Sequence, residues 1–219
     1  MGELFAYSIT TFCAVFFVVD PFVAVPLYLS MTAGDDPRRR RSTALKAAMT
    51  VACVLLTFAL AGGAIFRLFG ISIGAFRIAG GLLLFLMAVD MMRAQRSGTR
   101  TSDAEISEGA VQNESGIVPL GLPVLAGPGS IATVTVLMSS VRESISKAAI
   151  VVVSIMLTAL ITYIVLLGAT GLQRVLKTTG LNVLSRVMGL ILAAVAVQFV
   201  AVGIQELFPQ IATTAGKSF

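Results

Sequence analysis

The sequence has no histidine, no tryptophan, only two cysteines and few charged residues among its 219 positions. Without histidine, imidazole catalysis and the commonest protein metal ligand are both excluded. Cys13 and Cys53 lie inside apolar runs, so we expect no disulfide framework and treat both as small hydrophobic side chains. Charged residues make up 12% of the chain, whereas a soluble domain has roughly 25%. This scarcity excludes a soluble enzyme, a nucleic-acid-binding protein and a disordered chain.

Apolar residues are what the chain has in excess. They make up 57% of it, and the mean hydropathy is +0.94, more apolar surface than one soluble globule can bury. A helix needs about 20 apolar residues to cross a bilayer, and backbone in lipid must satisfy its own hydrogen bonds. The sequence therefore predicts an all-α polytopic membrane protein with six transmembrane helices, in the runs Leu4–Met31, Ala44–Phe66, Gly74–Met92, Ile117–Val141, Ala148–Ala169 and Val183–Ile204. The stretch Met1–Thr10 has no basic residue, so we expect the first run to be retained rather than cleaved as a signal.

Basic residues are distributed unequally between the two predicted faces of the membrane. One face carries ten of them, namely Arg38, Arg39, Arg40, Arg41, Lys46, Arg93, Arg96, Arg100, Arg174 and Lys177. The other face carries four, which are Arg67, Arg142, Lys147 and Lys217. Because cytoplasmic loops carry the excess of Lys and Arg, the first face is predicted to be cytoplasmic and both termini periplasmic.

Two halves of the chain share features at nearly one period. Arg77 and Arg186 are 109 positions apart, and Pro21 and Pro128 are 107 apart. Such matches indicate an internal repeat, and three spans in each half make the repeat inverted. The predicted organisation has a first three-helix repeat, a polar cytoplasmic linker, a second inverted three-helix repeat and a short tail, at residues 1–93, 94–116, 117–208 and 209–219.

Proline and glycine predict breaks in the first and fourth helices. Pro21 and Pro26 follow Asp20 within the first run, and Gly127-Pro128-Gly129 falls near the middle of the fourth, where we expect Ser130 to cap a following half-helix. Unwound backbone at membrane depth is tolerated only where protein buries it or where it lines a wet cavity. Two breaks at corresponding positions of inverted halves are typical of a transporter binding site, although kinked helices without a substrate are also common.

The same residues carry a family resemblance. Asp20-Pro21 with Pro26, the stretch Gly70–Gly81, the stretch Pro119–Ile131, and Gly180-Leu181-Asn182 with Arg186 and Gly189 occur in an order that resembles the MarC family of bacterial integral membrane proteins. That family includes the small neutral amino-acid transporters called SnatA. The resemblance implies six spans in the bacterial inner membrane and movement of glycine or alanine with a coupling proton or cation. Many members have Gly and Asn where this chain has Val23 and Ala24, so a polar ligand is missing at Ala24.

A substrate site between the two breaks is therefore predicted. Its members are Asp20, Pro21, Phe22, Ala24, Gly127, Pro128, Gly129 and Ser130. Half-helix N-termini suit a carboxylate, unwound carbonyls suit an ammonium group, and glycine lets a ligand approach the backbone. Asp20, the one carboxylate placed deep in the membrane, either couples protons or organises the site, or it only caps the broken helix.

Three further residues have two readings each. Arg77 and Arg186 either brace the broken helices or meet a substrate carboxylate, or they only extend to the membrane interfaces. Gln198, expected to be a buried amide, joins helices or binds substrate. Ser154, Thr158 and Thr162 recur every four residues, and they either line a path or let helices pack closely.

Several function classes compete with a transporter. An intramembrane serine protease would need a histidine that the chain lacks, and an aspartyl protease would need two facing Asp residues, so we predict that the chain is not an enzyme. No cofactor, metal or nucleic acid is implied, and the pattern indicates no particular oligomeric state. A scaffold or regulatory membrane protein, an exporter of another small metabolite or drug, and a channel remain as alternatives, but a scaffold would leave the mirrored breaks unexplained.

Overall fold

The structure is a computed structural model that describes residues 2–93, 125–141 and 144–209. Those ranges contain helices and short connections, which confirms the all-α prediction. The helices are α1 (Gly2–Val19), α2 (Ala24–Met31), α3 (Pro37–Phe69), α4 (Ile73–Met92), α6 (Pro128–Ser139), α7 (Ile145–Leu167) and α8 (Ala169–Leu207). The predicted linker at 94–116 lies outside the described residues, as do the first part of the fourth apolar run and nearly all of the tail.

Within the described residues, five helical segments are long and apolar enough to cross a membrane. They are α1, α3, α4, α7 and the part of α8 from Asn182 to Leu207. The apolar helix α6, with 12 residues, is shorter than a full span. The chain is thus a multi-pass membrane protein by length and composition. The fourth predicted span, Ile117–Val141, is described only in its second part.

Local signals set most helix ends. Asp36 caps α3 by accepting a hydrogen bond from the Arg39 backbone N–H, and Pro37 takes the first helical position, where its missing N–H costs nothing. Gly70 ends α3 with a φ of 65°, a left-handed conformation that favours glycine. Its predicted counterpart, Gly180, lies instead inside α8, which begins at Ala169, before the predicted run. The membrane-spanning part of α8, Asn182–Leu207, agrees with the predicted run Val183–Ile204. Without a proline, the polar stretch before Val183 stays helical.

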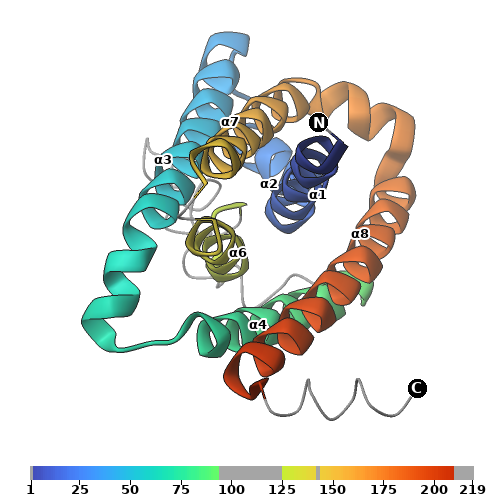
Figure 1. Cartoon of the computed structure of the whole chain (residues 1–219). Coiled ribbons are helices and arrows are strands. Elements are labelled where there is room, and N and C mark those ends of the chain that lie inside the picture. The colour runs from blue at the N-terminus through green and yellow to red at the C-terminus, as the bar shows by residue number, and fades with distance from the viewer. Residues whose placement is uncertain (1, 94–124, 142–143, 210–219) are drawn as a thin grey trace.

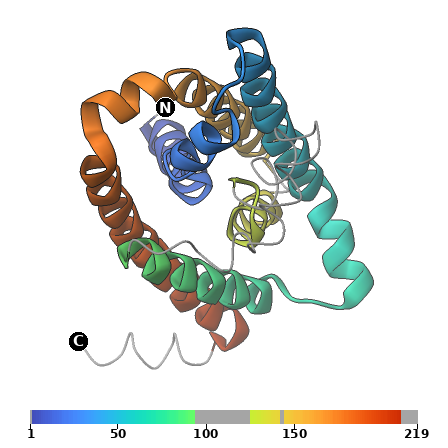
Figure 2. The same cartoon turned by 180° about the vertical axis from the view of Figure 1, so that it is seen from behind.

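The helices form a ring with a filled centre. Figures 1 and 2 show α3, α7, α8 and α4 around the outside, with α1, α2 and α6 enclosed between them. One core cluster joins residues of α1, α2, α3, α6 and α7, including Val19, Val25, Leu55, Val134 and Ile155. A second cluster joins Val18 of α1 to Leu84 and Met87 of α4 and Leu192 of α8. The enclosed helix α1 is thus packed on both sides.

Small residues hold α4 and α8 in close contact. A Cβ added to Gly81 would lie 2.8 Å from the Ala196 carbonyl oxygen, and one added to Gly203 would lie 2.8 Å from the Gly74 carbonyl oxygen. One added to Gly189 would lie 3.0 Å from the carbonyl oxygen of Ala88. Since the three contacts recur every seven residues, the two backbones approach along the length of the pair, as in other glycine-mediated membrane helix pairs.

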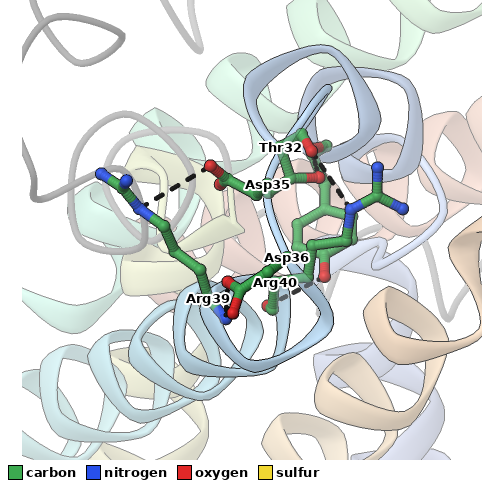
Figure 3. Close-up of polar contacts among 6 residues, drawn as sticks. Thr32, Asp35, Asp36, Arg39 and Arg40 are labelled. Atoms are coloured by element: carbon green, nitrogen blue, oxygen red, sulfur yellow. Dashed lines mark hydrogen bonds and ion pairs between the residues drawn. The ribbon is translucent and has the colours of Figure 1, made fainter.

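The C-terminal ends of α2 and α6 have similar bonding. The Thr32 hydroxyl after α2 donates to the Tyr28 carbonyl (2.8 Å), and the Ser140 hydroxyl after α6 donates to the Val136 carbonyl (2.9 Å). Around Thr32, Arg40 Nε donates to the Thr32 carbonyl oxygen (3.1 Å), as Figure 3 shows. Each end is followed four residues later by the N-cap of the next helix, Asp36 or Ser144.

Candidate functional site

The first helix break is centred on Asp20. Asp20 has a φ of 47°, and within the described residues it is the one non-glycine residue with a positive φ. Its side chain is buried, with only 1% of the residue exposed. The Asp20 N–H still bonds the Phe16 carbonyl (2.9 Å), whereas the Val23 N–H bonds the Asp20 carbonyl (3.3 Å) in a turn. The chain thus leaves α1 through a backbone conformation that Asp tolerates better than most residues.

The other residues predicted at this break take different positions. Pro21 is buried in the turn, and Ala24, fully buried, begins α2. Phe22 packs edge-to-face against Phe16 with ring centroids 6.2 Å apart, and it joins the cluster that contains α4 and α8. Pro26 lies in the first turn of α2, where a missing N–H does not interrupt the helix. The break is therefore confined to Asp20–Val23.

The second break precedes α6. Leu125 and Ala126 are buried, Gly127 is the N-cap with extended backbone, and Pro128 is the first helical residue. The prediction that Ser130 caps this helix is wrong, because Pro128 is pre-set for the first helical position and moves the cap to Gly127. Ser130 lies in the first turn, where its hydroxyl reaches back to the Gly127 (2.9 Å) and Leu125 (3.1 Å) carbonyl oxygens. Its one proton is shared between these two carbonyls of the unwound segment, of which the Gly127 carbonyl also accepts from the Ile131 N–H.

Gly129 faces another helix rather than open space. A Cβ added there would lie 2.6 Å from Leu84 Cδ2 and 2.9 Å from Met87 Sδ, both in α4. Glycine at this position therefore permits close packing of α6 against α4. We expected a ligand to approach the backbone at Gly129. The space beside its Cα is instead occupied by side chains of α4.

The structure brings the two breaks together at one core. Val19 and Ala24 from the first break share a buried cluster with Leu125 and Ala126 from the second. The residues predicted as substrate-binding therefore flank a common region, except that the Phe22 ring packs away in the other cluster and Pro128 is exposed. A cleft of about 390 Å³ lies elsewhere, at the α3–α4 turn beside Ser139, and none of the eight predicted binding residues lines it.

Arg77 links three helices. Its side chain is 11% exposed, and Nη1 bonds Glu206 Oε1 near the end of α8 (2.5 Å). Nη2 donates to the Ser140 hydroxyl at the end of α6 (2.7 Å). Glu206 and Ser140 are partners that sequence reasoning missed; an acidic residue at the far end of the last apolar run was the available signal for Glu206.

Arg186 and Gln198 lie on exposed parts of α8. The expectation of a buried amide at Gln198 is wrong for this chain, because the stripe Gly189, Ala196 and Gly203 that packs on α4 faces another direction. Neither residue lies with the buried side chains around the breaks.

Buried hydroxyl groups lie on α1 and α7, two helices that pack against each other. Thr11 and Thr158 are 1% and 0% exposed, and Ser154 and Thr162 on α7 are buried too. The four-residue spacing on α7 is visible in the sequence, whereas Thr11 gives no signal by itself, because it is one threonine in an apolar run.

Comparisons with known proteins agree over nearly the whole chain. Residues 5–208 match the family model described as MarC family integral membrane protein. The UPF0056 membrane protein YhcE of Escherichia coli (strain K12) is 39% identical over 198 residues, which are 90% of this chain and 92% of that protein. The UPF0056 membrane protein MJ1677 of Methanocaldococcus jannaschii is 38% identical over 199 residues, covering 91% and 96% of the two chains.

A third relative extends the same pattern. The UPF0056 membrane protein YvbG of Bacillus subtilis (strain 168) is 34% identical over 207 residues, 94% of this chain and 98% of that protein. No solved structure is significantly similar to the chain. With a family model and full-length relatives in agreement, the chain belongs to the MarC family of integral membrane proteins.

Proposed function

We propose that this protein is a secondary transporter of small neutral amino acids such as glycine and alanine, coupled to a proton or another cation. The observation that carries the proposal is the pair of helix breaks, at Asp20–Val23 and before Pro128, which share one buried core. Interrupted helices that meet within the membrane present backbone donors and acceptors to a ligand without any cofactor. A scaffold protein would gain nothing from the positive φ at a buried Asp20.

An inverted repeat is part of this proposal, and the local bonding supports it. Thr32 and Ser140, Asp36 and Ser144, and Arg39 and Lys147 hold matching cap positions, and the second residue of each pair lies 108 positions after the first. The packing follows the same exchange of halves, because α6 packs on α3 while its counterpart α2 packs on α7, and α4 packs on α8. Two such halves can rock against each other around a fixed site.

The chemistry of the breaks favours a small zwitterion. In α6 the first intrahelical bond runs from the Ile131 N–H to the Gly127 carbonyl, so the N–H groups of Gly129 and Ser130 precede it at the positive end of the helix dipole. These two donors suit a substrate carboxylate. The Asp20 carboxylate and the carbonyls at the end of α1 suit an ammonium group. Ala24, Ala126 and Gly127 leave little bulk between the breaks, which favours glycine and alanine over larger amino acids.

The test is flux of radiolabelled glycine and alanine in proteoliposomes. We expect saturable uptake that a pH or cation gradient accelerates, with labelled leucine taken up far more slowly. Liposomes without protein and liposomes with Val175→Ala, an exposed position on α8, provide the controls. Uptake of neither amino acid by folded protein would contradict the proposal and favour a scaffold; uptake of a different metabolite or drug in the same assay would favour an exporter of that compound.

The proposal includes orientation in the bacterial inner membrane, with both termini in the periplasm. The face predicted to be cytoplasmic carries the excess of basic residues, including Arg38–Arg41 at the start of α3, and this excess supports the orientation. A reporter that is active only in the periplasm should be active when fused after Pro209 and silent when inserted near Gly109. The reverse pattern would contradict the proposed orientation and would leave the proposed substrate unaffected.

A further inference from the structure

Three buried hydroxyl groups have no hydrogen-bond partner within the part of the chain that the structure describes. They are the Tyr7 phenol and the Thr11 hydroxyl on α1, and the Thr158 hydroxyl on α7. Their neighbours behave differently, because Ser154 donates to the Ile150 carbonyl and Thr162 donates to the Thr158 carbonyl, each at 2.8 Å. The same bond to the carbonyl four residues back would be open to Thr11 and Thr158, yet neither makes it.

The three hydroxyls lie along one helix pair. Lys147 at the start of α7 is 3.9 Å from Glu3 and 5.6 Å from the centre of the Tyr7 ring, which places the N-termini of α1 and α7 at the same face. Thr11 follows Tyr7 by one helical turn on the same side of α1. Thr158 lies 11 residues beyond Lys147, about 16 Å deeper along α7.

The three hydroxyls are distributed over most of the depth between the Glu3–Lys147 face and the first helix break. Asp20 comes 13 residues after Tyr7, about 20 Å deeper along α1. The hydroxyls of Tyr7, Thr11 and Thr158 therefore form a series that starts beside the Glu3–Lys147 pair and approaches the depth of Asp20. The charged groups at its entrance are Glu3 and Lys147, and the acidic group at its inner end is Asp20.

Buried hydroxyls without protein partners are sites where proteins hold water. A buried water typically makes about three hydrogen bonds to polar groups that the protein leaves unsatisfied. Hydroxyl groups suit a water chain because each both donates and accepts. A proton can pass along such a chain, since each oxygen binds an incoming proton and releases another, leaving the chain chemically unchanged.

We propose that Tyr7, Thr11 and Thr158 hold a chain of water between α1 and α7 that carries the coupling proton from the Glu3–Lys147 face to the break at Asp20. The proposal rests on the proposed transport function for its purpose. The presence of the water chain, however, can be measured without any substrate.

The first experiment measures access of a small thiol-reactive cation. In a background with Cys13→Ala and Cys53→Ala, the variants Thr11→Cys and Thr158→Cys are treated with Ag⁺ from the Glu3–Lys147 face in sealed vesicles. Remaining thiols are then alkylated with a maleimide after denaturation. We expect both variants to lose maleimide labelling, and the matched variant Ala159→Cys, buried beside Thr158, to retain it. Full labelling of Thr11→Cys and Thr158→Cys would show a dry interface and overturn the proposal.

The second experiment measures coupling. Thr158→Val keeps the side-chain shape and removes the hydroxyl, and Thr162→Val does the same where the hydroxyl is already bonded. We expect glycine uptake driven by a pH gradient to be lost in Thr158→Val and kept in Thr162→Val. Equal uptake by the two variants would overturn the proposal. A raised Tm for Thr158→Val together with normal uptake driven by the pH gradient would also overturn it, because the Thr158 hydroxyl would then have no role in coupling. Uptake driven by Na⁺ alone would overturn the proton assignment.

The two experiments separate the two proposals. If wild-type protein moves no amino acid while Ag⁺ reaches Thr11→Cys and Thr158→Cys, the transport function fails and the hydrated path stands. If wild-type protein transports glycine while both thiols stay protected, the path fails and the transport function stands.

Discussion

The two helix breaks solve the same backbone problem in different ways. At the first, a buried acidic residue, Asp20, takes a left-handed conformation with a φ of 47°. At the second, Gly127 has an ordinary extended conformation and the Ser130 hydroxyl covers two carbonyl oxygens. A non-glycine residue in a left-handed conformation costs about 1–3 kcal/mol, and such strain concentrates at functional sites. The first break is therefore strained and carries an acidic side chain, whereas the second is relaxed and carries no ionisable side chain.

The far ends of the two broken helices show a smaller difference. An arginine contacts each of them: Arg40 donates to the Thr32 carbonyl after α2, and Arg77 donates to the Ser140 hydroxyl after α6. Arg40 is only eight residues from its partner, so its contact is local. Arg77 joins α6 to α4 and, through Glu206, to α8. We infer that α6 is tied to the α4–α8 pair, while α2 is tied to the start of α3.

The largest expected effect is at the acidic break. Asp20→Asn removes the ionisable carboxyl group and keeps a residue that tolerates left-handed backbone. If Asp20 serves coupling, glycine uptake driven by a pH gradient should fall to the level of protein-free liposomes, with Tm in detergent near the wild-type value. If Asp20 only caps the end of α1, the Tm should fall as well.

Asp20→Gly sharpens this test, because glycine relieves the strained φ while also removing the carboxylate. A more stable but uncoupled Asp20→Gly protein would show that the strain is kept for function. Normal pH-driven uptake by a folded Asp20→Asn protein would remove Asp20 from the mechanism.

The second effect is on packing at the second break. In Gly129→Val the new side chain meets Leu84 and Met87 of α4, where an added Cβ would lie within 2.9 Å of both. Overpacking of this kind costs about 1–3 kcal/mol. We expect a lower Tm that Leu84→Ala partly restores. Gly171→Val is the matched control, since an added Cβ there meets nothing within 4 Å; an equal loss at Gly171 would contradict close packing as the cause.

Much of this comparison was predictable from the sequence. Apolar runs long enough to cross a membrane identified α4 as Gly74–Met92 against the observed Ile73–Met92, because a bilayer permits few alternatives. The positions of both breaks followed from proline and glycine chemistry. The N-cap at Gly127 was also within reach, because proline favours the first helical position.

Other features depend on tertiary contacts that no single segment encodes. The direction of Gln198 is set by how α8 rotates to pack its small residues on α4. The partner of Gly129 is α4, more than 40 residues earlier in the chain, and the partners of Arg77 come from α6 and α8. The early start of α8 at Ala169 gives no apolar signal, because the residues before Asn182 are largely polar and helix formation does not require an apolar sequence.

The third effect concerns the link from α6 to α4 and α8. Arg77→Ala removes an ion pair in which the Glu206 side chain is 40% exposed, so solvent screening limits its value. We expect a loss of about 1–2 kcal/mol in the free energy of unfolding, including the bond to Ser140. A double-mutant cycle with Glu206→Gln, followed by thermal unfolding in detergent, measures the coupling. Additive effects of the two changes would show that the pair contributes nothing.

The smallest effect tests whether the Ser130 hydroxyl stabilises the relaxed break. Ser130→Ala leaves the Gly127 and Leu125 carbonyl oxygens without this donor in a buried segment. A lost hydrogen bond of this kind costs about 1 kcal/mol. Ser30→Ala is a matched control, because the Ser30 hydroxyl makes the same bond to a carbonyl three residues back, to Leu27 at 2.8 Å, on an exposed surface where water replaces it. We therefore expect a lower Tm for Ser130→Ala and an unchanged Tm for Ser30→Ala. Equal Tm values for the two variants would mean that the second break is held by packing alone, and the contrast with the strained break at Asp20 would then rest on backbone conformation rather than on hydrogen bonding.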